Sequence, residues 1–137
     1  MTTQALLGVQ REDGSISGCY VHMDGYPEHM VSAIKDYVDR FTTTGLSLII
    51  SRAQSVGGMS CFNAPSDIGP DFAQSRETGF LEDPEPYIIN EKNWKEGELY
   101  AGWRYLVDYR SGEIKVEEKK SSTDWTADAR RYSKNSS

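Results

Sequence analysis

The sequence predicts an α+β fold, in which an antiparallel sheet of about five strands, built from two hairpins, is covered by one or two helices. Two pairs of short apolar runs, each joined by a polar turn that contains glycine, predict the hairpins. Between them lies a long segment whose apolar residues have helical spacing. Because strands and helices do not alternate along the chain, a doubly wound parallel sheet is not expected.

The first hairpin is predicted to join Ala5–Gln10 to Ile16–Met23 through residues 11–15. Asp13 and Gly14 lie in this polar connection. Glycine readily takes the positive φ that such turns require, so the pair is a strong hairpin signal.

A helix is predicted to begin at Pro27, because the first helical position loses nothing from proline's missing N–H. Gly25, just before it, is expected to adopt a conformation poorly open to other residues. One apolar face of the helix is expected to pack on the sheet: Met30, Val31, Ile34, Val38 and Phe41. Residues 42–45 (Thr-Thr-Thr-Gly) are predicted to end this helix near Phe41.

The next segments are harder to assign. The spacing in residues 46–55 favours a second helix, although residues 48–50 would also suit a buried strand. Residues 57–84 are rich in glycine and proline, which predicts a long irregular excursion over the surface. Residues 87–89 are a strand candidate.

Alternating apolar residues predict a second hairpin from residues 99–109 and 113–117, joined by a turn with Gly112. The length of 137 residues suits a single domain, which is predicted to span residues 1–117. Residues 118–137 form a polar tail.

The tail differs from the body in charge, with a net charge of +2 against −8 for residues 1–117. Trp125, Ala129 and Tyr132 fall on one stripe of a helix, so the tail is predicted to contain a short helix. Trp125 is the candidate anchor for a partner. The preferred interpretation of the tail is a disordered end that keeps the chain soluble, with the partner-binding helix as the alternative.

Composition excludes several classes of protein. The net charge of −6 and a pI near 4.9 argue against a protein that binds the phosphate backbone, so direct nucleic-acid binding is not expected. No apolar run approaches the length of a membrane span, and the N-terminus lacks the pattern of a secretory signal. Two cysteines are too few for a disulfide scaffold, which favours a reducing, cytoplasmic location.

The densest group of polar, chemically capable residues lies at residues 20–29, where a strand is predicted to meet a helix. His22 and Asp24 are the candidate catalytic residues, through proton transfer, and a metal site would add His29. The stronger interpretation is structural, because a turn followed by a helix start explains the same residues. The sequence carries no phosphate-loop or zinc-protease motif, and neither a metal nor a cofactor is expected.

The two cysteines, Cys19 and Cys61, are interpreted as ordinary buried residues. A zinc site that combined them with His22 and His29 is opposed by strand geometry, because residues three apart on a strand point to opposite faces.

Acidic residues outnumber basic ones between residues 77 and 98. Glu82, Asp83 and Glu85 are the candidate binding residues, on a surface that would dock a basic partner. The alternative is a solvated surface with no partner. Tyr26 is a further binding candidate, because Tyr26, Trp103 and Tyr105 could stack on a nucleotide base.

Residues 8–30, GVQREDGSISGCYVHMDGYPEHM, resemble the opening of a family of small uncharacterised phage and prophage proteins. In that family a hairpin containing Asp-Gly precedes a Tyr-Cys-His-Trp-Asp-Gly-Tyr-Pro motif, which reads YVHMDGYP here. Met23 stands in place of Trp and Val21 in place of Cys. The aromatic strand and hairpin over residues 99–116 also resemble the family's end. The resemblance implies a phage-encoded protein that acts inside a bacterial cell.

Together these features predict a non-enzymatic phage accessory protein that binds a bacterial host factor and inhibits or redirects it. The expected site of action is the cytoplasm of the infected cell. A small-molecule sponge for a nucleotide signal is the first alternative, and a small hydrolase that uses His22 and Asp24 is the second.

Overall fold

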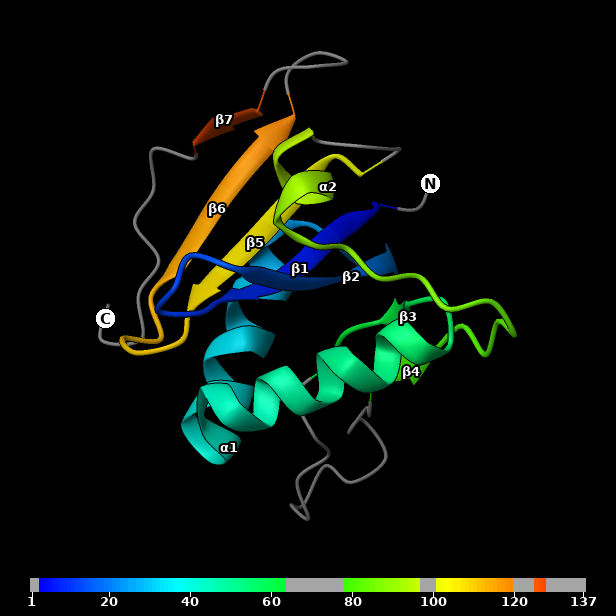
Figure 1. Ribbon diagram of the computed structural model, residues 1–137, viewed down its shortest axis with the longest axis horizontal. Coiled ribbons are helices and arrows are strands. Elements are labelled where there is room, and N and C mark those ends of the chain that lie inside the picture. The colour runs from blue at the N-terminus through cyan, green and yellow to red at the C-terminus, as the bar shows by residue number, and fades with distance from the viewer. Residues whose placement is uncertain (1–2, 64–77, 97–100, 120–124, 128–137) are drawn as a thin grey trace.

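The computed structural model describes residues 3–63, 78–96, 101–119 and 125–127. It contains a mixed sheet of seven strands in the order β4-β3-β2-β1-β5-β6-β7, with a long helix on one face and a short helix on the other (Figure 1). The elements are β1 (Ala5–Gln10), β2 (Ile16–Met23), α1 (Pro27–Ser55), β3 (Met59–Cys61), β4 (Gly79–Phe80), α2 (Glu91–Glu96), β5 (Trp103–Asp108), β6 (Ile114–Lys119) and β7 (Trp125–Ala127).

The α+β class is confirmed, and both hairpins form where the sequence predicts them. The first has the predicted bounds, and Gly14 in its turn has a φ of 87°. The expectation of a purely antiparallel sheet is wrong, because β1 pairs parallel with β5 and β2 pairs parallel with β3. Both parallel pairs join strands far apart in the chain, with α1 as the crossover between β2 and β3, so local turn signals could not reveal them.

Helix α1 begins at Pro27 as predicted and consists of two helices joined at a kink. The kink lies at Thr42, whose φ of 64° and ψ of 178° are not helical, inside the stretch predicted to break the helix. The preferred helix over residues 46–55 is confirmed. The prediction that Phe41 packs on the sheet is wrong: this residue directly precedes the non-helical Thr42, and its side chain is 47% exposed.

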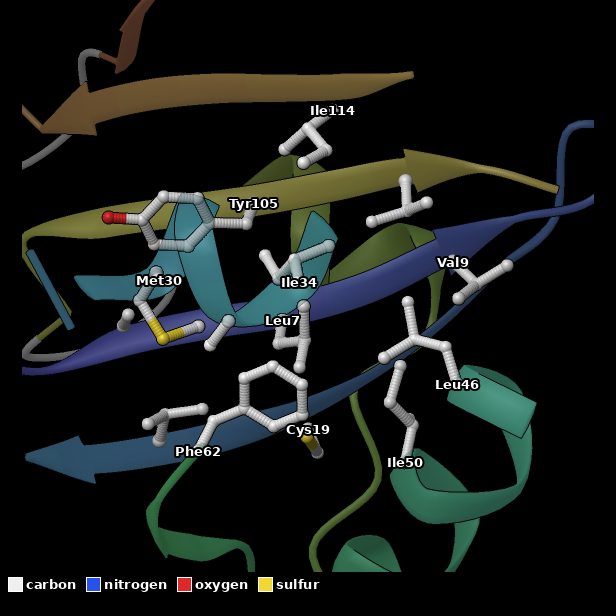
Figure 2. Packing of buried hydrophobic residues seen from close by; sticks show 14 of the residues in the cluster. Leu7, Val9, Cys19, Met30, Ile34, Leu46, Ile50, Phe62, Tyr105 and Ile114 are labelled. Carbon is white, nitrogen blue, oxygen red and sulfur yellow. The ribbon is translucent and has the colours of Figure 1, made fainter. Parts of the chain in front are cut away.

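The main core lies between α1 and one face of the sheet (Figure 2). Ile34 and Met30 of the first half of α1 are fully buried there, as are Leu46 and Ile50 of the second half. They pack against inward side chains of the central strands: Leu7, Val9, Cys19, Val21, Tyr105 and Val107. The predicted apolar face of α1 therefore forms the core, except at its last residue.

The other face of the sheet is also covered, which the sequence did not indicate. Trp94 of α2 lies over Gly8 and Gly18, where any added Cβ would stand 2.8 Å and 3.2 Å from the indole ring. Arg104 of β5 donates to the backbone oxygen of Trp94 and forms an ion pair with Glu117 at 2.9 Å. A second, smaller core forms there, so both faces of the sheet are apolar near its centre.

Three further expectations are corrected. Residues 57–84 are not irregular throughout, because they contribute β3 and β4; residues 64–77 lie outside the described residues. The strand candidate at residues 87–89 forms only an isolated bridge between Ile89 and Gly18. The predicted tail helix is contradicted at Trp125–Ala127, which pair with β6 as β7 and so gain backbone hydrogen bonds that a short helix in water lacks. The rest of that helix lies outside the described residues.

Candidate functional site

The carboxyl ends of β2 and β3 lie side by side, next to the first turn of α1. The two strands are parallel, and Met23 at the end of β2 is paired with Cys61 at the end of β3. Ligand sites in sheets with parallel strands favour this kind of edge, where strand ends meet a helix N-terminus. The sequence placed its catalytic candidates at the same junction.

Four polar side chains converge there, which we call the thiol cluster: Asp24, His29, Cys61 and Asn63. The Cys61 thiol donates to Asp24 Oδ2 over 3.3 Å. His29 Nε2 lies 3.9 Å from the same sulfur, and Asn63 Oδ1 lies 3.7 Å from it. The thiol is therefore surrounded by hydrogen-bonding side chains, one of which is a carboxylate.

Backbone geometry places Asp24 in the cluster. Its φ of 56° is unusual for a residue other than glycine, and it interrupts the alternation of side chains along β2. The neighbouring Gly25 is fixed on both sides: its N–H donates to the Thr3 oxygen over 2.8 Å, and its carbonyl oxygen accepts from the buried Tyr105 hydroxyl over 2.5 Å. These contacts hold the strained residue in place.

The reason that Gly25 is needed differs from the prediction. The left-handed conformation belongs to Asp24, whereas Gly25 lies outside the positive-φ region. An added Cβ at Gly25 would stand 2.7 Å from both the Ala5 Cβ and the Thr3 backbone oxygen. Close approach of two chain segments, rather than φ, therefore excludes a side chain here.

His29 connects the cluster to a small hollow on α1. Its Nε2 lies 2.6 Å from the Phe62 carbonyl oxygen, which can only accept, so this nitrogen carries the proton. In this tautomer the ring is a hydrogen-bond donor next to Cys61 and does not accept the thiol proton. The hollow has a volume of about 210 Å³ and is lined by Glu28, His29, Ser32, Ala33 and Asp36.

The proposed pairing of His22 with Asp24 does not form. His22 Nδ1 instead lies 2.9 Å from the Tyr20 hydroxyl, and Tyr20 packs against the core on the opposite face of the sheet. Parity along the strand predicts a shared face, but the φ of Asp24 turns its carboxylate toward Cys61. Partial burial raises the pKa of Tyr20, so its hydroxyl keeps its proton at neutral pH.

The two cysteines have different environments. Cys19 is fully buried in the main core, and desolvation raises the pKa of its thiol. Cys61 keeps 9% of its surface exposed and has the polar neighbours described above. Both cysteines are buried, as predicted, and Cys61 differs from Cys19 in its polar neighbours. Within the described ranges no three His, Cys, Asp or Glu side chains are placed to hold a metal ion.

The acidic candidates lie on residues 81–88, which we call the acidic strap. Glu82, Asp83 and Glu85 are exposed, and so are Leu81 at 37% and Ile88 at 59%. The strap has no regular secondary structure, yet backbone bonds hold it along the end of α1. The N–H groups of Leu81, Asp83 and Tyr87 donate to Gly58, Val56 and Gln54 over 2.8–3.1 Å.

The aromatic candidates for base stacking do not form one site. Tyr105 is fully buried, and Trp103 is half-buried against the main core. Tyr26 is 40% exposed and contacts the His29 ring at a centroid distance of 6.1 Å. Trp125 lies in β7, and its side chain is outside the described part of the chain.

A larger pocket that the sequence did not indicate lies at the kink of α1. Its volume is about 500 Å³, and it is lined by Arg11, Glu12, Asp13, Thr44, Ser47, Leu48 and Tyr109. Thr43 donates to the backbone oxygen of Tyr109 over 2.7 Å, which ties the kink to the turn between β5 and β6. We call it the kink pocket. Its residues come from three separate segments, so no local pattern could identify it.

Comparisons with protein-family models, curated proteins and solved structures found no match to this chain. Over the described residues, no helix combines the length and the apolar character needed to span a bilayer.

Proposed function

We propose that this chain is a binding protein that docks a basic partner protein through the acidic strap. The observation that carries the proposal is that the strap is exposed and yet held by backbone hydrogen bonds to the end of α1. A segment already fixed in its bound shape loses little conformational entropy when a partner binds.

The side chains of the strap suit such a contact. Glu82 and Glu85 present carboxylates that would steer a basic surface into place. Ile88, at 59% exposure, and Leu81 supply apolar area that a partner would bury. Protein interfaces usually have polar and charged residues at the rim and apolar residues in the buried centre.

The partner that we propose is a bacterial host factor, such as a defence or nucleic-acid-processing enzyme. Enzymes that bind nucleic acid carry the clustered cations that an acidic surface complements. Binding would inhibit or redirect the enzyme by occupying that cationic surface. The resemblance of residues 8–30 to phage proteins supports a host factor as the target.

Affinity capture from a bacterial lysate tests this proposal when variants are compared. Ile88→Ser should reduce the captured protein at least tenfold, whereas Leu48→Ser, at a site 68% exposed in the kink pocket, should not. The double variant Glu82→Gln/Glu85→Gln should capture less of the partner, and its capture should depend less on salt concentration. The control double variant Asp39→Asn/Glu113→Gln, which removes two exposed carboxylates elsewhere, should change neither. Equal capture by the strap variants and their controls would contradict the proposal.

A small-molecule sponge is the second candidate, and the kink pocket favours it. Its volume of about 500 Å³ lies in the range of ligand sites, and Tyr109 and Arg11 offer a ring and a cation. Nucleotides that raise the melting temperature of the wild type but not of Leu48→Asp would support this function. No shift with any nucleotide in the screen would exclude it.

A further inference from the structure

The thiol cluster has a chemical arrangement that docking through the acidic strap does not use. Asp24, His29 and Cys61 come from the end of β2, the first turn of α1 and the end of β3, so three segments build one group of reactive side chains. Of the two cysteines, only Cys61 has such neighbours, since Cys19 is sealed in the core.

We propose that Cys61 is a nucleophile that accepts an acyl group from a small thioester. Asp24 Oδ2 already accepts the thiol hydrogen bond over 3.3 Å, so it is placed to take the proton as sulfur attacks. The Nε2–H of His29, 3.9 Å from the sulfur, already donates to the Phe62 carbonyl oxygen over 2.6 Å, and in the reaction it would be shared with an oxygen on the carbon that sulfur attacks.

Cys61 Sγ bonds to the thioester carbonyl carbon while its proton moves to Asp24 Oδ2. The carbonyl oxygen becomes an oxyanion that shares the His29 Nε2–H with the Phe62 carbonyl oxygen. The bond from that carbon to the original sulfur then breaks, and the departing thiolate takes the proton from Asp24. The products are acylated Cys61 and a free thiol, with no oxidation or reduction.

The geometry also selects the substrate class. Asp24 takes the thiol proton and returns it to the departing group, so expulsion of a strongly basic amine would depend on this one carboxyl group. A thiolate departs without prior protonation, which makes a thioester a suitable substrate and an amide a poor one. Because Cys61 is only 9% exposed, the acyl group must be small.

Intact-protein mass spectrometry with S-phenyl thioacetate as the probe tests the proposal. Wild type should gain one acetyl group, located at Cys61 by peptide mapping, with Cys19 unmodified. Cys61→Ser should gain none at that position. If the folded wild type is not acetylated and only the urea-unfolded chain is, the proposal is overturned.

Asp24→Asn is the sharpest variant, because asparagine tolerates the left-handed backbone as well as aspartate does but cannot accept the proton. It should keep the melting temperature and slow acetylation at least tenfold. An unchanged or faster rate of acetylation would overturn the proposal, since the Asp24 carboxylate would then act only by disfavouring ionisation of the Cys61 thiol.

His29→Gln, which keeps a hydrogen-bond donor, should retain more of the acetylation rate than His29→Ala. Equal rates in these two variants would also count against the assigned role of His29.

Discussion

The thiol cluster and the acidic strap each contain a strained residue, but the structure holds the two residues differently. Asp24 has a φ of 56° and Glu82 a φ of 57°, values that cost energy for residues other than glycine. At Asp24 the side chain accepts a bond from Cys61, whereas Glu82 is exposed in a segment held by its backbone. The two strained residues therefore differ in surroundings: the Asp24 side chain has a partner inside the fold, and the Glu82 side chain is available to a partner molecule, as the two proposals require.

Removal of core volume should weaken both regions together. Ile34→Ala deletes a fully buried side chain of α1 and should lower the free energy of unfolding by about 2–5 kcal/mol. Chemical denaturation followed by fluorescence measures this loss. An unchanged denaturation midpoint would show that α1 does not pack on the sheet. The positions assigned to the thiol cluster and the acidic strap, which both depend on α1, would then be wrong.

Gly25→Ala should damage the thiol cluster and spare the strap. The new Cβ would stand 2.7 Å from a backbone oxygen and from another Cβ, so we expect a loss of about 1–3 kcal/mol. Denaturation measures that loss, and capture of a partner at equal folded concentration measures the strap. Gly102→Ala is the matched control, because nothing lies within 4 Å of its added Cβ. Equal destabilisation by the two substitutions would contradict the close approach at Gly25.

Replacing each strained residue with glycine sharpens the comparison. Glu82→Gly should raise the free energy of unfolding by between zero and about 1 kcal/mol. Glycine relieves the φ strain at this position, and that gain offsets the extra conformational freedom that glycine gives the unfolded chain. Asp24→Gly relieves similar strain but loses the bond from Cys61, so its stability should be lower than that of Glu82→Gly. Thermal melts of the two variants at one pH measure the difference. The reverse order would mean that the Cys61 bond contributes nothing.

Local signals predicted the fold well where partners are close in the chain. The Asp13-Gly14 turn fixed the first hairpin to the residue, and Pro27 marked the start of α1. The parallel pairs could not be predicted, because pairing of β1 with β5 depends on contacts made across most of the chain. Strand β3 has three residues and follows two glycines, too short a stretch to show alternation.

The junction that holds the thiol cluster was singled out from the sequence, but the full membership of the cluster was not. Sequence analysis chose the junction and Asp24 but paired Asp24 with His22, because strand parity assumes an extended backbone, and the φ of 56° breaks that assumption. Cys61 was considered beside His29 only for a zinc site, and Asn63 was not considered, since both lie at the end of β3 or just after it, more than 30 positions from Asp24. The acidic strap was found from its charge alone, while the backbone bonds that hold it left no pattern in the sequence.

The most direct test of the central claim, that the strap is an ordered docking surface, is hydrogen exchange at single amides with and without the captured partner. In the free chain, the amides of Asp83 and Tyr87 should already be protected, because they donate to Val56 and Gln54. The partner should add protection over residues 81–88 and leave the kink pocket unchanged. Unprotected strap amides in the free chain, or new protection confined to the kink pocket, would contradict the account.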